Sequence, residues 1–171
     1  IIHGLGGGSH ESLIRDFAET IEKKTSGWGV VVINSRGCGR TKLTSGKLFN
    51  AGSTNDIREV LQDFKKRWPN RPIYLVGFSF GGALTANFLG EEGEKENSES
   101  LVKAACTVGC PWDFVDGAYH LQKSWTGKYL LSPALAKFLA KIVTNNYKEL
   151  ETYAPDIVNK ETLKVIKNCK T

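Results

Sequence analysis

The stretch Pro72-Ile73-Tyr74-Leu75-Val76-Gly77-Phe78-Ser79-Phe80-Gly81-Gly82-Ala83-Leu84 decides the fold of this chain. An apolar, β-rich run leads to one serine, and small residues typical of a packed helix follow it. This is the pattern of a nucleophile elbow, in which Ser79 projects its hydroxyl above a sheet. Gly77 and Gly81, two residues on either side, lack side chains that would clash in so tight a turn. We therefore predict that Ser79 is a catalytic nucleophile. A glycine-rich strand-to-helix turn of another α/β protein is the alternative.

The segment His3-Gly4-Leu5-Gly6 predicts the second half of such a site. In serine hydrolases of this architecture, one oxyanion donor is the amide after the nucleophile, here Phe80, and the other comes from the loop after an early strand. We expect the Leu5 amide to be that second donor. His3 precedes the serine in the chain, so we expect it to bond the loop backbone rather than act as the base.

The glycine-rich segments do not have the glycine spacing that nucleotide-binding loops need. Gly4-x-Gly6 is followed by Ser9 where a dinucleotide-binding fingerprint needs its third glycine. We therefore do not expect a nucleotide ligand.

The composition is that of an ordinary globular domain, with 171 residues of which 40% are hydrophobic. The net charge of +5 comes from scattered lysines without a compact basic run, so we expect no nucleic-acid partner. A weak preference for anionic membrane surfaces stays open. Among the four cysteines there is no Cys-x-x-Cys pair, and Cys106 lies in an apolar run that predicts burial.

Strand and helix patterns alternate along the first two thirds of the chain. Apolar runs at residues 29–34 and 73–78 predict buried strands, the run at 102–108 predicts a further strand, and a strand end opens the chain. Helices are expected after Ser9, from Thr54 and after the elbow serine. Ser9 and Thr54 are the expected N-caps of the first two helices. Residues 94–100 read as a polar loop. The alternation predicts parallel crossovers in an α/β fold, with helices on both faces of the sheet.

From Phe114 onward only helical patterns appear, at residues 130–143, 147–153 and 162–166. We therefore expect a partial hydrolase core at residues 1–112 and a partial helical cap at residues 113–171. The apolar side of the cap would line an acyl pocket. Plain packing of these helices on the sheet is the alternative.

Several motifs resemble the YheT-type branch (AB hydrolase 4) of the α/β-hydrolases, which includes fungal medium-chain fatty-acid ethyl ester synthase/esterases and acylglycerol lipases. They are His3-Gly4-Leu5 with Gly6–Ser12, Asn34–Arg40, Leu48–Arg58, the elbow Gly77–Gly82, Ala86–Gly93 and Cys110–Asp113. The resemblance is specific over residues 1 to about 113 and loose beyond. It implies an α/β-hydrolase fold and a Ser-Asp-His triad that acts on carboxylic esters without a metal or organic cofactor.

One departure from the pattern matters. In this fold the acid and the base follow the serine, and the histidine comes after the last strand. The only histidine after Ser79 is His120, at the start of the expected cap. Because the chain also lacks methionine and opens in a strand, we interpret it as a piece of a longer protein. The hydrolase fold would be truncated at both ends, and the triad Asp and His would lie beyond Thr171.

The sequence thus predicts a serine hydrolase that cleaves medium-chain acyl esters or acylglycerols through an acyl-serine intermediate. Transfer of the acyl group to an alcohol instead of water would make it an alcohol O-acyltransferase. The alternative is a non-catalytic fragment or pseudoenzyme that binds acyl chains or a partner. We expect a small-molecule ester substrate, no obligate protein partner and an intracellular location, either cytoplasmic or associated with membranes or lipid droplets.

Overall fold

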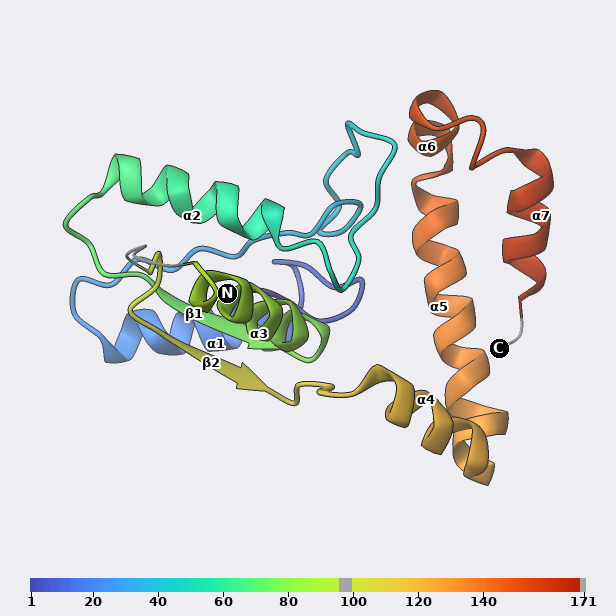
Figure 1. Ribbon diagram of the computed structural model, residues 1–171, viewed down its shortest axis with the longest axis horizontal. Coiled ribbons are helices and arrows are strands. Elements are labelled where there is room, and N and C mark those ends of the chain that lie inside the picture. Colours follow the sequence, from blue (N-terminus) through green and yellow to red (C-terminus); the bar gives the residue numbers. More distant parts are fainter. Residues whose placement is uncertain (96–99, 170–171) are drawn as a thin grey trace. The chain divides into compact units, whose positions relative to one another are not determined.

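The computed structural model describes residues 1–95 and 100–169, and its contacts divide them into two compact units (Figure 1). The N-terminal unit contains residues 1–35 and 49–111, and the C-terminal unit contains residues 36–48 together with the chain from Trp112 onward. Each unit has a hydrophobic cluster of its own.

The N-terminal unit is built on short parallel pairings. β1 (Tyr74–Phe78) pairs in parallel with β2 (Ala104–Val108), with Tyr74 opposite Ala104 and Phe78 opposite Val108. On the other side of β1, Ile2 bridges Gly77, and Ile2 also bridges Ile33. Four chain segments therefore lie side by side in the order Ile33, Ile2, β1, β2.

Helices cover both faces of this layer, as the sequence predicts. They are α1 (Ser12–Lys24), α2 (Asn55–Arg67) and α3 (Phe80–Gly93). α2 and α3 pack on the face that carries Leu75, and the buried cluster there consists of Ile2, Ile57, Leu61, Leu75, Leu84, Phe88 and Val102. On the opposite face, Phe17 of α1 packs edge-on against Phe78, with 5.2 Å between ring centroids. The α/β fold class is confirmed.

Two predictions about burial are wrong. Residues 29–34 form no buried strand: only Ile33 makes a bridge, and 46% of Val31 is exposed. Within the described residues this segment lies at an edge and pairs only with the segment of Ile2. Its β-branched side chains are therefore not covered on both faces, as those of a central parallel strand would be. Cys106 is exposed rather than buried, because it lies on β2 at the other edge of the layer.

One of the two predicted helix N-caps is observed, and neither predicted residue caps a helix amide with its side chain. The N-cap of α1 is Glu11 rather than the predicted Ser9, whose amide and hydroxyl both bond the side chain of Asn34. Thr54 is the N-cap of α2 as predicted, but its hydroxyl donates to Glu91 and caps no amide. The predicted polar loop at residues 94–100 lies partly outside the described residues, at 96–99.

The C-terminal unit is helical, as predicted for the part of the chain that is described. It contains α4 (Phe114–Lys123), the π-helical turn η1 (Gly127–Leu131), α5 (Ser132–Asn145), α6 (Tyr147–Tyr153) and α7 (Lys160–Asn168). Asp113 caps α4, and Asn159 with Thr162 forms a capping box on α7. Among the described residues, no helix is long and apolar enough to cross a membrane.

Candidate active site

Ser79 is an exposed residue in the turn between β1 and α3. Its backbone has φ 50° and ψ −118°, a conformation that costs a non-glycine residue about 1–3 kcal/mol. Hydrogen bonds hold it there: the Ser79 amide donates to the Val108 carbonyl at 2.8 Å, and the Ser79 carbonyl accepts from the Gly82 amide at 2.8 Å. The end of β2 and the first turn of α3 therefore fix the serine from both sides.

The two elbow glycines sit where the backbone is crowded. A Cβ atom on Gly77 would collide with the Gly81 carbonyl oxygen and with Thr85 Oγ1. A Cβ atom on Gly81 would lie 2.5 Å from the carbonyl oxygens of Ile2 and His3. Since these neighbours are mainly backbone atoms, they cannot move aside as a flexible side chain would. Glycine at position 77 thus leaves room for the start of α3, and glycine at position 81 lets α3 pack against the first strand segment.

The loop after Ile2 passes next to the serine. A Cβ atom on Gly4 would lie 3.5 Å from Ser79 Cβ and 3.7 Å from the Phe78 carbonyl oxygen. The Leu5 amide follows directly after this closest approach, and the Phe80 amide opens α3 on the other side of the serine. The structure therefore brings the segments of all five predicted site residues together: Leu5, Gly77, Ser79, Phe80 and Gly81.

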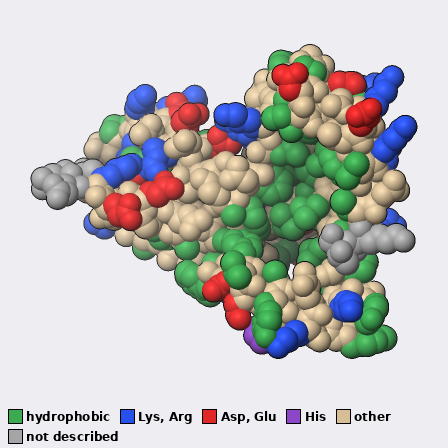
Figure 2. Space-filling view, turned by 45° about the vertical axis from the view of Figure 1, so that its right-hand side comes forward, with side chains coloured by type: hydrophobic (Ala, Val, Ile, Leu, Met, Phe, Trp, Pro, Cys, Tyr) green, Lys and Arg blue, Asp and Glu red, His purple; other side chains and the backbone are tan. Residues whose placement is uncertain are grey.

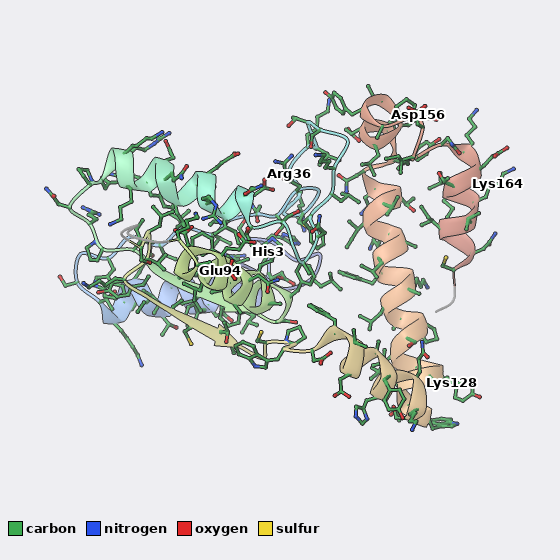
Figure 3. All side chains as sticks on the ribbon, viewed as in Figure 1. His3, Arg36, Glu94, Lys128, Asp156 and Lys164 are labelled. Atoms are coloured by element: carbon green, nitrogen blue, oxygen red, sulfur yellow. The ribbon has the colours of Figure 1, made fainter. Side chains whose placement is uncertain are left out.

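His3 supports the loop from inside the N-terminal unit (Figure 3). Only 1% of the residue is exposed, and its Nε2 accepts a hydrogen bond from the Ser35 amide at 3.0 Å. Nδ1 must then carry the proton, and it donates to the Gly4 carbonyl at 2.7 Å. Burial lowers the pKa of His3 below its ordinary value, although the bond to Gly4 and the charge of Glu11 partly offset this. The prediction that His3 bonds the loop backbone is confirmed.

Further bonds hold the glycine-rich loop itself. Asn34 Oδ1 accepts from the Ser9 amide at 2.8 Å, and Asn34 Nδ2 donates to Ser9 Oγ at 3.2 Å. Glu11 Oε2 accepts from the Gly8 amide at 3.3 Å. The loop beside Ser79 is thus bonded at both ends, which suits a site whose donors must be in place before a substrate arrives.

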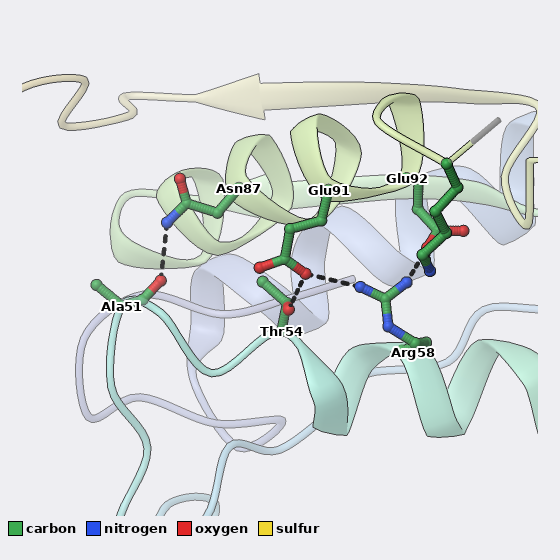
Figure 4. Close-up of polar contacts among 7 residues, drawn as sticks. Ala51, Thr54, Arg58, Asn87, Glu91 and Glu92 are labelled. Atoms are coloured by element: carbon green, nitrogen blue, oxygen red, sulfur yellow. Dashed lines mark hydrogen bonds and ion pairs between the residues drawn. The ribbon is translucent and has the colours of Figure 1, made fainter.

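A polar cluster links α2 to the helix that carries the serine (Figure 4). Arg58 forms ion pairs with Glu91, at 2.7 Å, and with Glu92, and the Thr54 hydroxyl also donates to Glu91. Asn87 Nδ2 donates to the Ala51 carbonyl at 2.9 Å. Sequence reasoning missed this cluster. The available signals were an arginine next to the apolar positions of α2 and the adjacent Glu91 and Glu92 near the end of α3. Neither signal says that these side chains meet.

Among the described residues, no side chain is placed as a general base for Ser79 or as the acid that would orient such a base. Within residues 1–95 and 100–169, no hydrogen bond joins the Ser79 hydroxyl to a histidine. His3 is occupied by the loop backbone, and His120 pairs with Asp116 on α4 at 3.4 Å. In the same described part, no group of three or more His, Cys, Asp or Glu side chains could hold a metal ion. The triad Asp and His expected beyond Thr171 stay a prediction.

A comparison with protein families agrees with this geometry. The family model described as alpha/beta hydrolase fold matches residues 1–169. The chain belongs to the α/β-hydrolase family. No solved structure matches it significantly.

Individual relatives are esterases and lipases by name. The chain is 46% identical over 150 residues to medium-chain fatty acid ethyl ester synthase/esterase 2 of Saccharomyces cerevisiae, which covers 88% of the chain and 32% of that protein. It is 36% identical to the monoacylglycerol lipase of the same yeast, over 96% of the chain and 36% of the lipase. It is 28% identical to the putative esterase YheT of Escherichia coli, over 75% of the chain and 36% of that protein. The chain thus spans about a third of the length of these curated relatives.

Proposed function

We propose that this chain supplies the nucleophile and the oxyanion hole of a carboxylic ester hydrolase. The observation that carries the proposal is the strained, exposed Ser79, held at the start of α3 with the Gly4 loop beside it. A serine at φ 50° is retained at a cost, and sites that keep such strain are commonly functional.

The chemistry follows from this placement. Ser79 Oγ attacks the ester carbonyl carbon while its proton passes to a histidine supplied by a part of the protein outside this chain. The carbonyl oxygen becomes an oxyanion, which the amides of Leu5 and Phe80 stabilise. When the carbon–oxygen bond of the ester breaks, the alcohol leaves with the proton and an acyl-serine remains. Water then attacks the acyl-serine and releases the acid.

The names of the relatives suggest the substrate class. One acts by name on medium-chain fatty acid ethyl esters and another on monoacylglycerol. We infer that the substrate is an ester of a fatty acid. The word synthase in the first name also supports a second outcome for the acyl-serine, in which an alcohol takes the place of water and a new ester forms.

We also propose that residues 1–112 belong to the catalytic core and residues 113–171 to a helical cap. Support comes from the change of structure at Asp113, the N-cap after which every described element is helical. A cap of this kind would determine whether water or an alcohol reaches the acyl-serine.

The test is labelling of the full-length protein with a fluorophosphonate, followed by peptide mapping of the adduct. We expect one adduct, on the peptide that contains Ser79, and its loss in Ser79→Ala. Ser26→Ala, which changes an exposed serine in a loop, should label like the wild type.

Thermal unfolding of each variant shows whether it has folded. A folded protein that gives no adduct on Ser79 would overturn the proposal and leave the non-catalytic alternative. Ethanol added during ester turnover then separates the two acceptors, since an ethyl ester product appears only if an alcohol can replace water.

A further inference from the structure

The C-terminal unit exposes aromatic and apolar side chains where α4 meets η1. Trp125 is 74% exposed and Leu130 is 63% exposed, and the rings of Trp125 and Tyr129 lie 6.0 Å apart. Tyr119, one turn before the end of α4, is also exposed. A contiguous group of this kind is unusual on a surface that faces only water.

Two lysines are interleaved with these rings. Lys123 Nζ lies 4.3 Å from the centroid of the Tyr119 ring, and Lys128 Nζ lies 5.3 Å from the centroid of the Tyr129 ring. Both lysines are exposed, and Lys128 lies at the end of the unit where α4, η1 and α5 meet (Figure 3). We call these six residues the lysine–aromatic patch: Tyr119, Lys123, Trp125, Lys128, Tyr129 and Leu130.

The backbone of the turn is specialised to present the patch. Gly127 is buried, and a Cβ atom there would collide with the Leu121 carbonyl oxygen and with Ser124 Oγ. Its amide donates to Ser124 Oγ at 3.0 Å, while the Lys128 amide donates to the Ser124 carbonyl at 2.9 Å. Trp125 and Lys128 are thereby held on a tight, internally bonded turn rather than on a free loop.

Lysines outnumber acidic residues in the sequence around the patch. Residues 117–148 contain five lysines and no aspartate or glutamate. In the whole sequence, the C-terminal unit has 13 Lys and Arg against 6 Asp and Glu, whereas the N-terminal unit has 10 against 12. The acidic residues nearest to the patch in sequence are Asp113 and Asp116 at the start of α4, where Asp116 lies one turn before Tyr119 and pairs with His120 at 3.4 Å. Figure 2 shows hydrophobic and basic side chains beside one another on this unit.

We propose that the lysine–aromatic patch binds the anionic surface of a phospholipid membrane. Tryptophan and tyrosine favour the headgroup region, where the ring is buried and its polar atom stays hydrated. Lysines at the same depth meet the phosphates and anionic headgroups, and their stems cover apolar surface. A purely apolar occupant would leave Lys123 and Lys128 without a counter-charge, and the lysines of a second copy of the same surface would repel them.

The test is co-sedimentation of the full-length protein with vesicles of phosphatidylcholine alone and with phosphatidylserine added. We expect binding to the anionic vesicles that weakens as salt is raised. The double variant Lys123→Gln/Lys128→Gln should weaken it about 25-fold, from roughly fivefold for each lysine. Trp125→Ala should weaken binding to both kinds of vesicle. The matched control is Lys160→Gln/Lys164→Gln, which removes the same charge from two exposed positions of α7 in the same unit and should change binding little.

Three outcomes would overturn the proposal: equal losses in the test and control variants, binding that ignores phosphatidylserine, or no vesicle binding together with a dimer that Trp125→Ala dissociates. The last result would show that the patch pairs with a second copy of the chain. The proposal does not rest on ester hydrolysis, since Ser79→Ala should bind vesicles like the wild type. Its failure is thus distinguishable from failure of the enzymatic proposal.

Discussion

At the scale of single residues, the candidate site depends on absent side chains as much as on present ones. Ser79 keeps its left-handed φ because the Val108 carbonyl and the first turn of α3 hold it, and the turn closes only because Gly77 and Gly81 leave room. Gly81 also lets the carbonyls of Ile2 and His3 lie against the elbow. Strain at the serine is therefore offset by packing around it.

Gly81→Ala tests this dependence. Its Cβ would meet backbone oxygens of Ile2 and His3 at 2.5 Å, so we expect a loss of roughly 2–4 kcal/mol in unfolding free energy and loss of fluorophosphonate labelling. Gly90→Ala is the matched control on the same helix, because nothing lies within 4 Å of its Cβ and the change should stabilise by up to about 1 kcal/mol. Chemical denaturation measures both. Equal effects at the two positions would contradict the crowding argument.

His3 gives the N-terminal unit a predictable pH response. Burial lowers its pKa below the ordinary 6.5, so the unfolded chain binds this proton more readily than the folded one. The contribution to stability is thus complete above pH 6.5 and is lost as the pH falls towards the lower folded-state pKa. In His3→Gln we expect a flatter dependence of unfolding free energy on pH between neutrality and mild acid. Identical slopes in His3→Gln and the wild type would contradict this assignment.

At the scale of elements, α3 is placed by its far end as well as by the elbow. Arg58 of α2 reaches Glu91 and Glu92, and its side chain lies over the Phe88 ring at 5.2 Å. The side chains of Arg58 and Glu92 are only 15% and 7% exposed, so these charges are largely removed from water. The pairing holds the helix that carries Ser79 against α2 and the core.

Removing one partner should therefore be costly. In Arg58→Met we expect a loss of about 2 kcal/mol in unfolding free energy. Glu92 keeps its charge in a largely buried position and loses one of its two cationic partners, while Lys95 still pairs with it. The double variant Arg58→Met/Glu92→Gln should lose less than the sum of the two single changes. The exposed pair of Arg67 and Asp63 on the same helix is the control, and Arg67→Met should cost no more than about 0.5 kcal/mol. If the double variant loses as much as the two single variants together, Arg58 and Glu92 do not stabilise each other.

The sequence predicts those elements whose pattern is local. The spacing of Ile57 and Leu61 predicts α2, and the Gly-x-Ser-x-Gly elbow predicts the turn at Ser79 and the start of α3. The strand pattern at residues 29–34 misleads, because β-branched residues indicate a buried strand only where neighbours exist on both sides. The contacts of Arg58 and the bond from Ser35 to His3 join residues more than 30 positions apart, and no local spacing encodes such pairs.

At the scale of the whole molecule, the chain crosses between its two units more than once. It leaves the N-terminal unit after Ser35, contributes residues 36–48 to the C-terminal unit and returns at Phe49, before its final passage at Pro111. The excursion is anchored within the C-terminal unit: Leu43 is buried with Leu150 and Val158, and Asn146 Nδ2 donates to the Gly37 carbonyl at 3.1 Å. The C-terminal unit is therefore built from two separate parts of the sequence.

Leu43→Ala tests whether this anchoring holds the excursion in place. The change removes a buried side chain, so we expect it to cost about 2–4 kcal/mol and to loosen residues 36–48 from α6. Brief trypsin digestion reads this out directly, since Arg40, Lys42 and Lys47 lie in the excursion and should be cut faster than in the wild type. Leu13→Ala, at an exposed leucine in the first turn of α1, should leave the digestion pattern unchanged. If Leu43→Ala keeps the wild-type cleavage rates at these three sites, the excursion is held by Asn146 and the remaining contacts instead of by burial of Leu43.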